Sequence, residues 1–236
     1  MKKHVLILGG SSDIGIEVIK QFFKIGWKVT AHCSKNKKNL EKLNNHGDLE
    51  IIQIDFSKVK NSNFMNNINI KLKSRFDSFI NLVGYTDNKS FENTSIENII
   101  KTLSVNFILP LIIQKFLIKK MIKQKWGRIL NCSGIGVKFG GGKFNYNYAL
   151  SQHCREFIPS LYKSWAGENV LINNIRIGVT DTKLHSRVKK NMKNRVKLIP
   201  IKRMASPKEM AKYIINLSTE TNTYITGQTI TVAGGE

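Results

Sequence analysis

Short apolar runs alternate with longer amphipathic segments along the chain, and this alternation limits the fold more than any other feature. In residues 13–25 the apolar side chains recur at helical spacing, and residues 207–217 repeat the pattern after Ser206, a typical helix N-cap. The runs expected to form strands are 4–8, 27–32, 49–54, 79–83, 128–132, 170–177 and 228–232. Strands that alternate with helices are typical of a parallel sheet covered by helices. We therefore predict a three-layer, doubly wound parallel α/β sheet of about seven strands, with helices on both faces, as a single domain over 1–236.

The chain is strongly basic, with 38 Lys and Arg against 16 Asp and Glu and a net charge of +22. Lys, Asn and Ile are abundant along its whole length, so a compositional bias explains much of this charge as solvated surface. Such a charge still attracts polyanions at low salt. Because no aromatic-interleaved basic motif or zinc finger accompanies it, we expect no specific nucleic-acid partner. A polyanion-binding protein without a cofactor stays open as an alternative.

Cysteine usage and hydropathy indicate a cytoplasmic protein. The three cysteines form an odd set without Cys-x-x-Cys spacing, so we expect reduced thiols and no metal site. The apolar run 105–118 is interrupted by Asn106, Pro110 and Gln114, and it is shorter than the roughly 20 residues that span a bilayer. We expect this run to form a buried or interface helix and predict no membrane span.

A glycine-rich turn follows the first expected strand, with the sequence Gly-Gly-Ser-Ser-Asp-Ile-Gly at 9–15. In this position, backbone N–H groups and the helix dipole can hold the pyrophosphate of a dinucleotide. Gly9 permits the tight turn, and Gly15 allows the helix to pack closely on the sheet. A turn of this kind alone is a weak signal for a nucleotide site.

This turn resembles the Gly-x-x-x-Gly-x-Gly turn of the short-chain dehydrogenase/reductase family, with Asp13 where the middle glycine usually stands. The resemblance covers nearly the whole chain, including residues 224–228 and 233–235 near its end. It implies a Rossmann-type oxidoreductase similar to 3-oxoacyl-carrier-protein reductases or sugar reductases. A carboxylate aimed at the pyrophosphate would repel it, so the Asp13 side chain has to point away if a dinucleotide binds.

The same resemblance assigns the cofactor-binding residues. Asp55 matches the family's aspartate near the adenine ring, and residues 81–84 match its Asn-Asn-Ala-Gly segment under the cofactor. Gly178 and Thr182 match a Pro-Gly-x-x-x-Thr motif that reaches the nicotinamide, although Ile177 replaces the proline. The residues expected to contact the cofactor are Gly9, Ser11, Ser12, Ile14, Gly15, Ser34, Asp55, Phe56, Asn81, Gly84, Gln152, Gly178 and Thr182.

The identity of the cofactor depends on the end of the second strand, which reads His-Cys-Ser-Lys at 32–35 and has no acidic residue before Glu41. An acidic residue at this place binds the 2′-hydroxyl of NAD, whereas basic or hydroxyl groups accommodate the 2′-phosphate of NADP. We therefore predict NADP, with NAD as the weaker candidate. The alternative is that these lysines are only the solvated start of the next helix.

The catalytic residues follow from the family's Ser-Tyr-x-x-x-Lys arrangement, in which the tyrosine transfers a proton and the lysine lowers its pKa. Tyr148 matches the tyrosine, and Gln152, four residues later on the same helical face, stands at the lysine position. The position of the family's serine is taken by Gly134. Ser133, one residue earlier, is either the oxyanion donor or a structural strand-end residue. Asn106 matches the asparagine that holds a proton-relay water.

The missing lysine has a consequence for the direction of the reaction. A phenol titrates near pH 10, and a nearby cation makes its ionised form accessible for alcohol oxidation. Reduction instead uses a neutral tyrosine as proton donor. We therefore predict carbonyl reduction. A catalytically silent dinucleotide-binding protein, acting as a sensor or assembly subunit, is the alternative.

Residues 183–203 match the family's substrate lid and contain nine basic residues and no acidic one. A positive lid would concentrate anionic substrates, such as nucleotide-linked or phosphorylated sugars or a 3-oxoacyl group on an acidic carrier. The lysine-rich composition is the alternative explanation. Apolar stretches at 105–118 and 157–165 resemble the faces by which family members pair, so we expect a homodimer or homotetramer.

Overall fold

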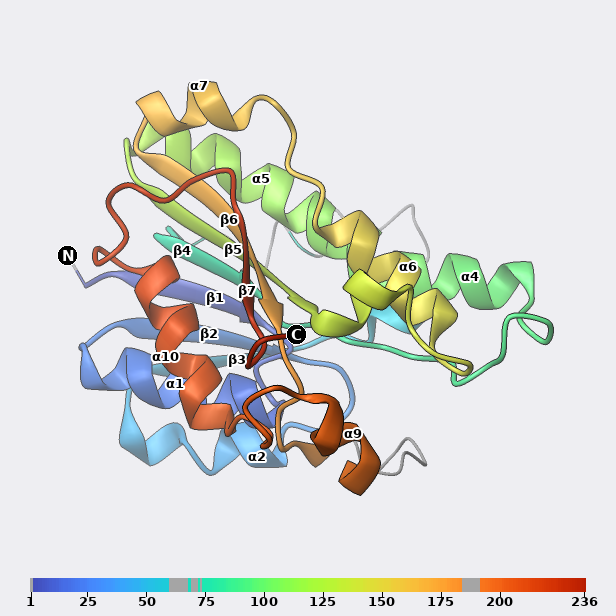
Figure 1. Cartoon of the computed structure of the whole chain (residues 1–236). Helices are drawn as coiled ribbons and strands as arrows, with labels where there is room; N and C mark the ends of the chain where they lie inside the picture. The colour runs from blue at the N-terminus through green and yellow to red at the C-terminus, as the bar shows by residue number, and fades with distance from the viewer. Residues whose placement is uncertain (1, 60–67, 69–71, 73, 184–191) are drawn as a thin grey trace.

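The computed structural model describes residues 2–59, 68, 72, 74–183 and 192–236, and its strands form one sheet (Figure 1). The strand order is β3-β2-β1-β4-β5-β6-β7, and all neighbouring strands are parallel. The strands are β1 His4–Leu8, β2 Lys28–Cys33, β3 Leu49–Gln53, β4 Ser78–Asn81, β5 Gly127–Gly134, β6 Val170–Ile177 and β7 Thr229–Val232. Helices cover both faces, so the predicted doubly wound α/β fold is confirmed.

The helices divide between the two faces of the sheet. In Figure 1, α1, α2 and α10 lie on one side, and α5, α6 and α7 lie on the other. The helices are α1 Asp13–Lys24, α2 Lys38–Glu41, α4 Ile96–Leu103, α5 Leu109–Lys123, α6 Tyr146–Arg155, α7 Tyr162–Gly167, α9 Met192–Leu198 and α10 Pro207–Ser218. Short 3-10 turns follow β3 at Phe56–Lys58 and β5 at Ile135–Phe139.

Two apolar cores hold these layers together. Val18 and Phe22 of α1 pack with Ile214 of α10 in one core, and Ile113 and Leu117 of α5 belong to the other. Every residue of β1 is buried. A strand covered on both faces reads as a continuous apolar run, which is why the sequence located it correctly.

Two strands end two residues away from their predicted ends, whereas β2 ends one residue later and β3 one residue earlier than predicted. β4 stops at Asn81, two residues early, because the Asn81 side chain accepts the N–H of Val83 at 3.3 Å and turns the backbone. β5 continues to Gly134, two residues late, because it stays paired with β6 up to Ile177. Both differences lie at the carboxyl edge of the sheet, where the predicted site residues gather.

The apolar run around 105–118 forms a helix, as predicted. A π-helical turn at Ser104–Ile108 joins α4 to α5, and the continuous helix Ile96–Lys123 is long and apolar enough to cross a membrane by length and composition. Its α5 part buries Ile113 and Leu117 against the sheet, as the core helix of a folded domain does. Pro110 lies in the first turn of α5, where proline is tolerated.

The strand order reverses next to β1, because β2 and β3 lie on one side of it and β4 to β7 on the other. Ligands of doubly wound sheets bind at the carboxyl ends of the strands beside such a switch point. The segments that follow β1 and β4 therefore mark where a ligand would lie.

The N-terminus of α10 is fixed by a capping box. The Ser206 hydroxyl accepts the N–H of Glu209 at 3.1 Å, and the Glu209 carboxylate accepts the N–H of Ser206 at 2.7 Å. Hydrogen bonds from Arg203 and from the Ser206 N–H lower the pKa of Glu209 to about 2. The N-terminus of α10 is thus stabilised by hydrogen bonds to the side chains of both Ser206 and Glu209.

We predict that Ser206→Ala lowers the free energy of unfolding by about 1 kcal/mol, because it removes the helix cap. Urea denaturation measures the change. The exposed Ser160, which lies outside α10, provides the matched control, and Ser160→Ala should change stability by less than about 0.5 kcal/mol. Equal losses in the two variants would show that the cap contributes nothing.

Candidate active site

The turn after β1 joins the carboxyl end of the strand to α1. Gly9 has φ +74°, and a Cβ atom there would lie 2.8 Å from the carbonyl carbon of Leu82, so only glycine fits this contact. A Cβ atom on Gly15 would lie 2.6 Å from the carbonyl oxygen of Gly10. Ser12 caps α1, since its hydroxyl accepts the N–H of Gly15 (3.1 Å) and donates to the carbonyl of Gly9 (2.8 Å). The first turn of α1 therefore presents its amides at the switch point, as a phosphate site requires.

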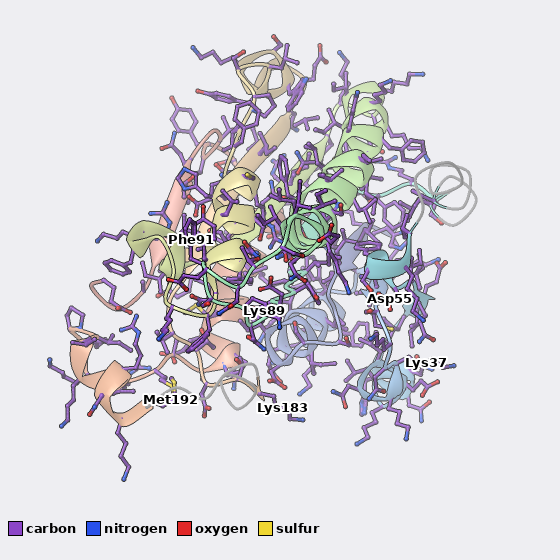
Figure 2. The ribbon with its side chains drawn as sticks, turned by 90° about the vertical axis from the view of Figure 1, so that its right-hand side faces the viewer. Lys37, Asp55, Lys89, Phe91, Lys183 and Met192 are labelled. Atoms are coloured by element: carbon purple, nitrogen blue, oxygen red, sulfur yellow. The ribbon has the colours of Figure 1, made fainter. Side chains whose placement is uncertain are left out.

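Asp13 takes part in a contact that the sequence did not predict. Its Oδ2 accepts the N–H of Lys183 at 2.7 Å, at the start of the predicted lid. The carboxylate is therefore held by a residue far away in the sequence, and the expectation that it points away from a bound pyrophosphate stays a prediction. Its neighbours Ser11 and Ile14 are partly exposed, and Ile14 also packs against the first core. Figure 2 looks onto this edge of the sheet and shows Lys183 near Met192.

The segment after β3 offers a site for the adenine end of a dinucleotide. Asp55 Oδ1 accepts hydrogen bonds from the N–H and the hydroxyl of Ser57, whereas the buried Oδ2 has no hydrogen-bond partner among the described residues. Phe56 is buried and stacks on His32 with ring centroids 4.3 Å apart. The His32 Nδ1 accepts the N–H of Gly9 at 3.3 Å. Sequence reasoning gave His32 no role, although its place at the end of β2 was a signal.

The end of β2 has the charge expected for NADP. Ser34 and Lys35 are exposed there. Glu41, the first acidic residue after the strand, pairs with Lys37 at 2.9 Å in α2 and its preceding turn. In Figure 2 Lys37 and Asp55 lie on the same side of the molecule. A 2′-phosphate at this end would meet the hydroxyl of Ser34 and the ammonium group of Lys35, which also act on the carboxylate of Asp55.

Tyr148 lies on α6 and directs its hydroxyl toward the ends of β4 and β5. A Cβ atom on Gly84 would lie 3.7 Å from its ring, and one on Gly134 would lie 3.8 Å from its hydroxyl oxygen. Burial raises the pKa of Tyr148, and the charge of Arg155 opposes this shift. The hydroxyl is therefore protonated at neutral pH, the form that donates a proton.

Ser133 does not share this environment. Its hydroxyl donates to the carboxylate of Glu156, which forms an ion pair with Arg176. Successive strand side chains point in different directions, so the position that faces Tyr148 is Gly134 and not Ser133. This placement favours the structural alternative, and the oxyanion role of Ser133 stays a prediction.

Asn106 lies in the π-helical turn and is fully buried. Its carboxamide accepts the N–H of Tyr85 and donates to the carbonyl of Tyr85, both at 2.8 Å, and it also donates to the hydroxyl of Ser151 at 2.8 Å. The side chain therefore ties the segment after β4 to α6. The carbonyl oxygen of Asn106 accepts hydrogen bonds from Arg155. A role in holding a proton-relay water stays a prediction.

Gln152 is the clearest indication of a missing ligand. Its side chain is fully buried, yet neither its amide nitrogen nor its amide oxygen has a hydrogen-bond partner among the described residues. Leaving such a group unpaired costs about 1–3 kcal/mol, so these atoms need a partner that the described residues do not supply. Ribose hydroxyl groups can donate to the oxygen and accept from the nitrogen. Gln152 therefore fits a bound nicotinamide dinucleotide.

Arg155 is a site residue that sequence reasoning missed. It follows Gln152 on α6 and is buried, and its guanidinium donates to the main-chain carbonyls of Val83 (2.6 Å) and Cys132 (2.7 Å). The family resemblance carried no motif over this position. The buried face of α6 is largely polar, so an arginine in this stretch carried no signal of its own.

The segment after β4 crosses in front of α6. Phe91 packs edge to face on Tyr146 with centroids 4.9 Å apart, and the amide of Asn147 donates to Asp87 at 2.7 Å and to Thr94. Figure 2 shows Phe91 beside α6. These contacts hold the segment close to the helix that carries Tyr148.

The remaining predicted cofactor residues lie at the same edge of the sheet. Asn81 is buried at the end of β4. A Cβ atom on Gly178 would lie 2.5 Å from Cα of Ala233, so this glycine is required by the packing of the chain after β7. Thr182 is partly exposed. Their contacts with a cofactor stay predictions.

The described part of the lid is less positive than its composition indicated. Arg195 pairs with Glu236, and Arg203 pairs with Glu209 at 2.7 Å. Of the other basic residues in the described range, Lys193, Lys197 and Lys202 are exposed. Arg187, Lys189 and Lys190 lie outside the described residues.

Metal chemistry finds no support in the described part of the chain, where no group of His, Cys, Asp or Glu side chains could hold an ion. The cysteines are free thiols: Cys33 and Cys132 are buried, and Cys154 is partly buried. Burial raises the pKa of Cys132 to about 12, so this thiol is neutral at physiological pH.

A glycine-rich turn at the switch point, a tyrosine facing the strand ends and a buried unpaired amide define the class of nicotinamide-dependent oxidoreductases with a doubly wound sheet. Comparison with known proteins agrees, because residues 9–236 match the family model described as Enoyl-(Acyl carrier protein) reductase. The chain belongs to the short-chain dehydrogenase/reductase family, which confirms the resemblance seen in the sequence.

Relatives match between two thirds and nearly all of the chain. An acetoacetyl-CoA reductase from Acinetobacter sp. (strain RA3849) is 26% identical over 99% of this chain and 97% of its own length. A 3-oxoacyl-(acyl-carrier-protein) reductase from Aquifex aeolicus (strain VF5) is 35% identical over 67% of this chain and 64% of its own. The crystal structure of a 3-oxoacyl (acyl-carrier-protein) reductase from Agrobacterium tumefaciens C58 with NADP bound matches with a TM-score of 0.86, at 20% identity, covering 99% of this chain and 94% of that one.

We predict that Gly134→Ser increases the rate of carbonyl reduction by tenfold or more, on the order of the effect of one oxyanion donor. Gly134 has extended backbone angles that any residue adopts, and its Cβ would meet Tyr148 at an ordinary contact distance of 3.8 Å. Steady-state kinetics with NADPH measure the change.

The matched control is Ser133→Ala, which removes the hydroxyl that bonds Glu156. It should lower stability and leave kcat within about twofold. A loss of kcat on the order of 100-fold in this variant, without unfolding, would restore Ser133 as the oxyanion donor.

Proposed function

We propose that the protein is an NADP-dependent reductase that converts a carbonyl group to an alcohol. The observation that carries the proposal is the protonated hydroxyl of Tyr148 at the ends of β4 and β5, one helical turn from the unpaired buried amide of Gln152. The cofactor is NADP, in agreement with the exposed Ser34 and Lys35 after β2 and with NADP-bound or NADPH-dependent matched structures. When bound, NADPH supplies the hydride.

The chain's own residues would divide the other tasks. Tyr148 donates its proton to the alkoxide that develops on the substrate oxygen. Gln152 hydrogen-bonds the ribose hydroxyls as a neutral group, and the first turn of α1 holds the pyrophosphate. Asn106 keeps Tyr85 and Ser151 in fixed positions on either side of the site.

The substrate class that we propose is a 3-oxoacyl group carried on an acidic carrier. Relatives over nearly the whole chain are named as reductases of acetoacetyl-CoA or of 3-oxoacyl groups on acyl-carrier protein. Exposed Lys193, Lys197 and Lys202 would attract an anionic carrier to the lid side of the site. Nucleotide-linked or phosphorylated sugars have the same charge and are the competing substrates.

We further propose a homodimer or homotetramer in the cytoplasm. The outer face of the α4–α5 helical run exposes a group of large apolar side chains. They are Ile96, Ile100, Ile108 and Leu111. A second copy of the chain would cover them, as in symmetric oligomers.

A catalytically silent dinucleotide-binding protein is the second candidate. It is favoured by the Ser133 hydroxyl, which is bonded to Glu156, and by the absence of a side chain at Gly134 beside Tyr148. Such a protein would bind NADPH through the same residues, the first turn of α1 and Gln152, without transferring hydride.

We predict that the purified protein oxidises NADPH in the presence of acetoacetyl-CoA and that Tyr148→Phe lowers kcat by about 100-fold or more. The loss of NADPH absorbance measures the rate. Ethyl acetoacetate, which is neutral, should be reduced with at least about tenfold lower kcat/KM if charge attracts the substrate.

Calorimetric binding of NADPH and NADH to the wild type and Tyr148→Phe provides the control. NADPH should bind both proteins and bind more tightly than NADH. Tight NADPH binding without turnover of any 3-oxoacyl or sugar carbonyl would establish the silent alternative, and no binding of either coenzyme would exclude both candidates.

We also predict that reduction is faster than alcohol oxidation at pH 7. Reduction needs the protonated Tyr148, so its rate should hold through neutral pH and fall as the pH rises through the raised pKa of this residue. Initial rates in both directions, measured from pH 6 to 10.5, test this. Oxidation equal to reduction at pH 7 would contradict the assignment.

A further inference from the structure

Arg155 is a buried cation that has no carboxylate partner among the described residues. Its side chain is 3% exposed, and the guanidinium donates to the carbonyls of Asn106 (3.0 Å), Val83 (2.6 Å) and Cys132 (2.7 Å). The adjacent acid, Glu156, is paired with Arg176 instead. Carbonyl dipoles solvate a cation without neutralising it, so the charge still acts on groups nearby.

The group placed to feel this charge is Tyr148. Both side chains come from α6, and seven residues apart they project from the same side of the helix. They also reach the same two strand ends. Arg155 donates to the carbonyls of Val83 and Cys132. Tyr148 lies against Gly84, one residue after Val83, and against Gly134, two residues after Cys132.

Gln152 lies between them on this face of α6. It is buried and carries no charge, so it cannot supply the electrostatic effect of a lysine at this position. The only positive charge held within this face is therefore that of Arg155 in the described structure. The carbonyls of Asn106, Val83 and Cys132 fix its position.

We propose that Arg155 is a positioning residue whose charge stabilises the negative charge that develops on the Tyr148 oxygen as its hydroxyl gives up a proton. The helix thus keeps a cation near the tyrosine, one turn beyond the place of the lost lysine. The catalytic use of this charge rests on the proposed reductase function. The tests of the charge itself need neither cofactor nor substrate.

The charges of the neighbouring groups agree with this role. Burial lowers the pKa of Arg155 to about 10, which still leaves it charged at pH 7. Its charge opposes the effect of burial on the pKa of Tyr148. The other titratable group that faces the pair is Cys132 of β5, whose pKa of about 12 keeps it neutral.

The first test compares Arg155→Met with Arg155→Lys. Tyr148 ionisation is followed by phenolate absorbance, as the difference between each protein and the same protein carrying Tyr148→Phe. We expect Arg155→Met to raise the ionisation midpoint of Tyr148 by about one pH unit and Arg155→Lys to leave it close to that of the wild type. The midpoint temperature of thermal unfolding should fall in both variants, because both lose hydrogen bonds to the carbonyls.

The double variant Gln152→Lys with Arg155→Met tests for rescue. It returns a cation to α6 without restoring the hydrogen bonds of Arg155, so the Tyr148 midpoint should fall back toward the wild-type value while stability stays low. A purely structural role predicts that all variants lose stability with no change in the midpoint. That result would overturn the proposal, as would equal shifts in Arg155→Met and Arg155→Lys.

A second neutral variant keeps the test decisive if Arg155→Met does not fold. Arg155→Gln removes the charge but keeps an amide that can donate to the carbonyls of Val83 or Cys132. It should raise the ionisation midpoint of Tyr148 as Arg155→Met does. An unchanged midpoint in Arg155→Gln would overturn the proposal.

Failure of this proposal and failure of the proposed function give different experimental results. A protein without reductase activity in which the midpoints still shift would reject the reductase and keep the coupling. An active reductase without the shifts would reject the coupling alone.

Discussion

The contact between the turn after β1 and the end of β4 determines the arrangement of the site. Gly9 comes so close to Leu82 that no side chain fits between them, and this places the first amides of α1 beside the segment that leads to Gly84. The parallel pairing of β1 with both β2 and β4 sets the register of this contact. His32 accepts the N–H of Gly9 and stacks on Phe56, and these two contacts connect the turn after β1 with the segment after β3. A bulkier residue at Gly9 would separate the phosphate end of the site from its catalytic end.

On the other side of the switch point, α6 organises polar groups around one tyrosine. Tyr148, Gln152 and Arg155 lie on one face of this helix, where Gln152 and Arg155 are buried and Tyr148 is partly exposed. The carbonyls of Val83 and Cys132 solvate Arg155, the charged member of the three. The arrangement differs from the family pattern in two respects, since Gly134 leaves the serine position without a side chain and the neutral Gln152 stands at the lysine position. Proton donation at the strand ends stays the proposed role of Tyr148, and the distribution of charge around it has changed.

Much of the fold could be predicted from the sequence because the responsible forces are local or periodic. The buried strand β1 is an almost continuous apolar run, and the amphipathic pattern of α1 and α10 shows which face is buried. The glycine turn and Tyr148 were found because a short sequence motif determines their backbone geometry. These features depend on residues within one element and its immediate neighbours.

The parts that could not be predicted depend on contacts between distant elements. The direction of the Ser133 hydroxyl is decided by Glu156 and Arg176, which come from different elements of the fold. In the sequence Arg155 does not stand out from the many other basic residues. Its role depends on carbonyls from three distant places, namely β5, the segment after β4 and the π-helical turn. The lid also carried less free charge than its composition indicated, because Glu209 and Glu236, outside the lid, neutralise two of its arginines.

The hydrogen bond between Asp13 and the N–H of Lys183 links segments that are 170 residues apart in sequence. Lifting Lys183 away from the turn requires breaking it, at a cost of about 1 kcal/mol for a partly solvated bond of this kind. An energy of that size corresponds to roughly a fivefold bias in the ratio of attached to detached chains. The movements of Lys183, the first residue of the predicted lid, and of the glycine-rich turn after β1 are therefore coupled. A coenzyme that bound between them would change the positions of both segments.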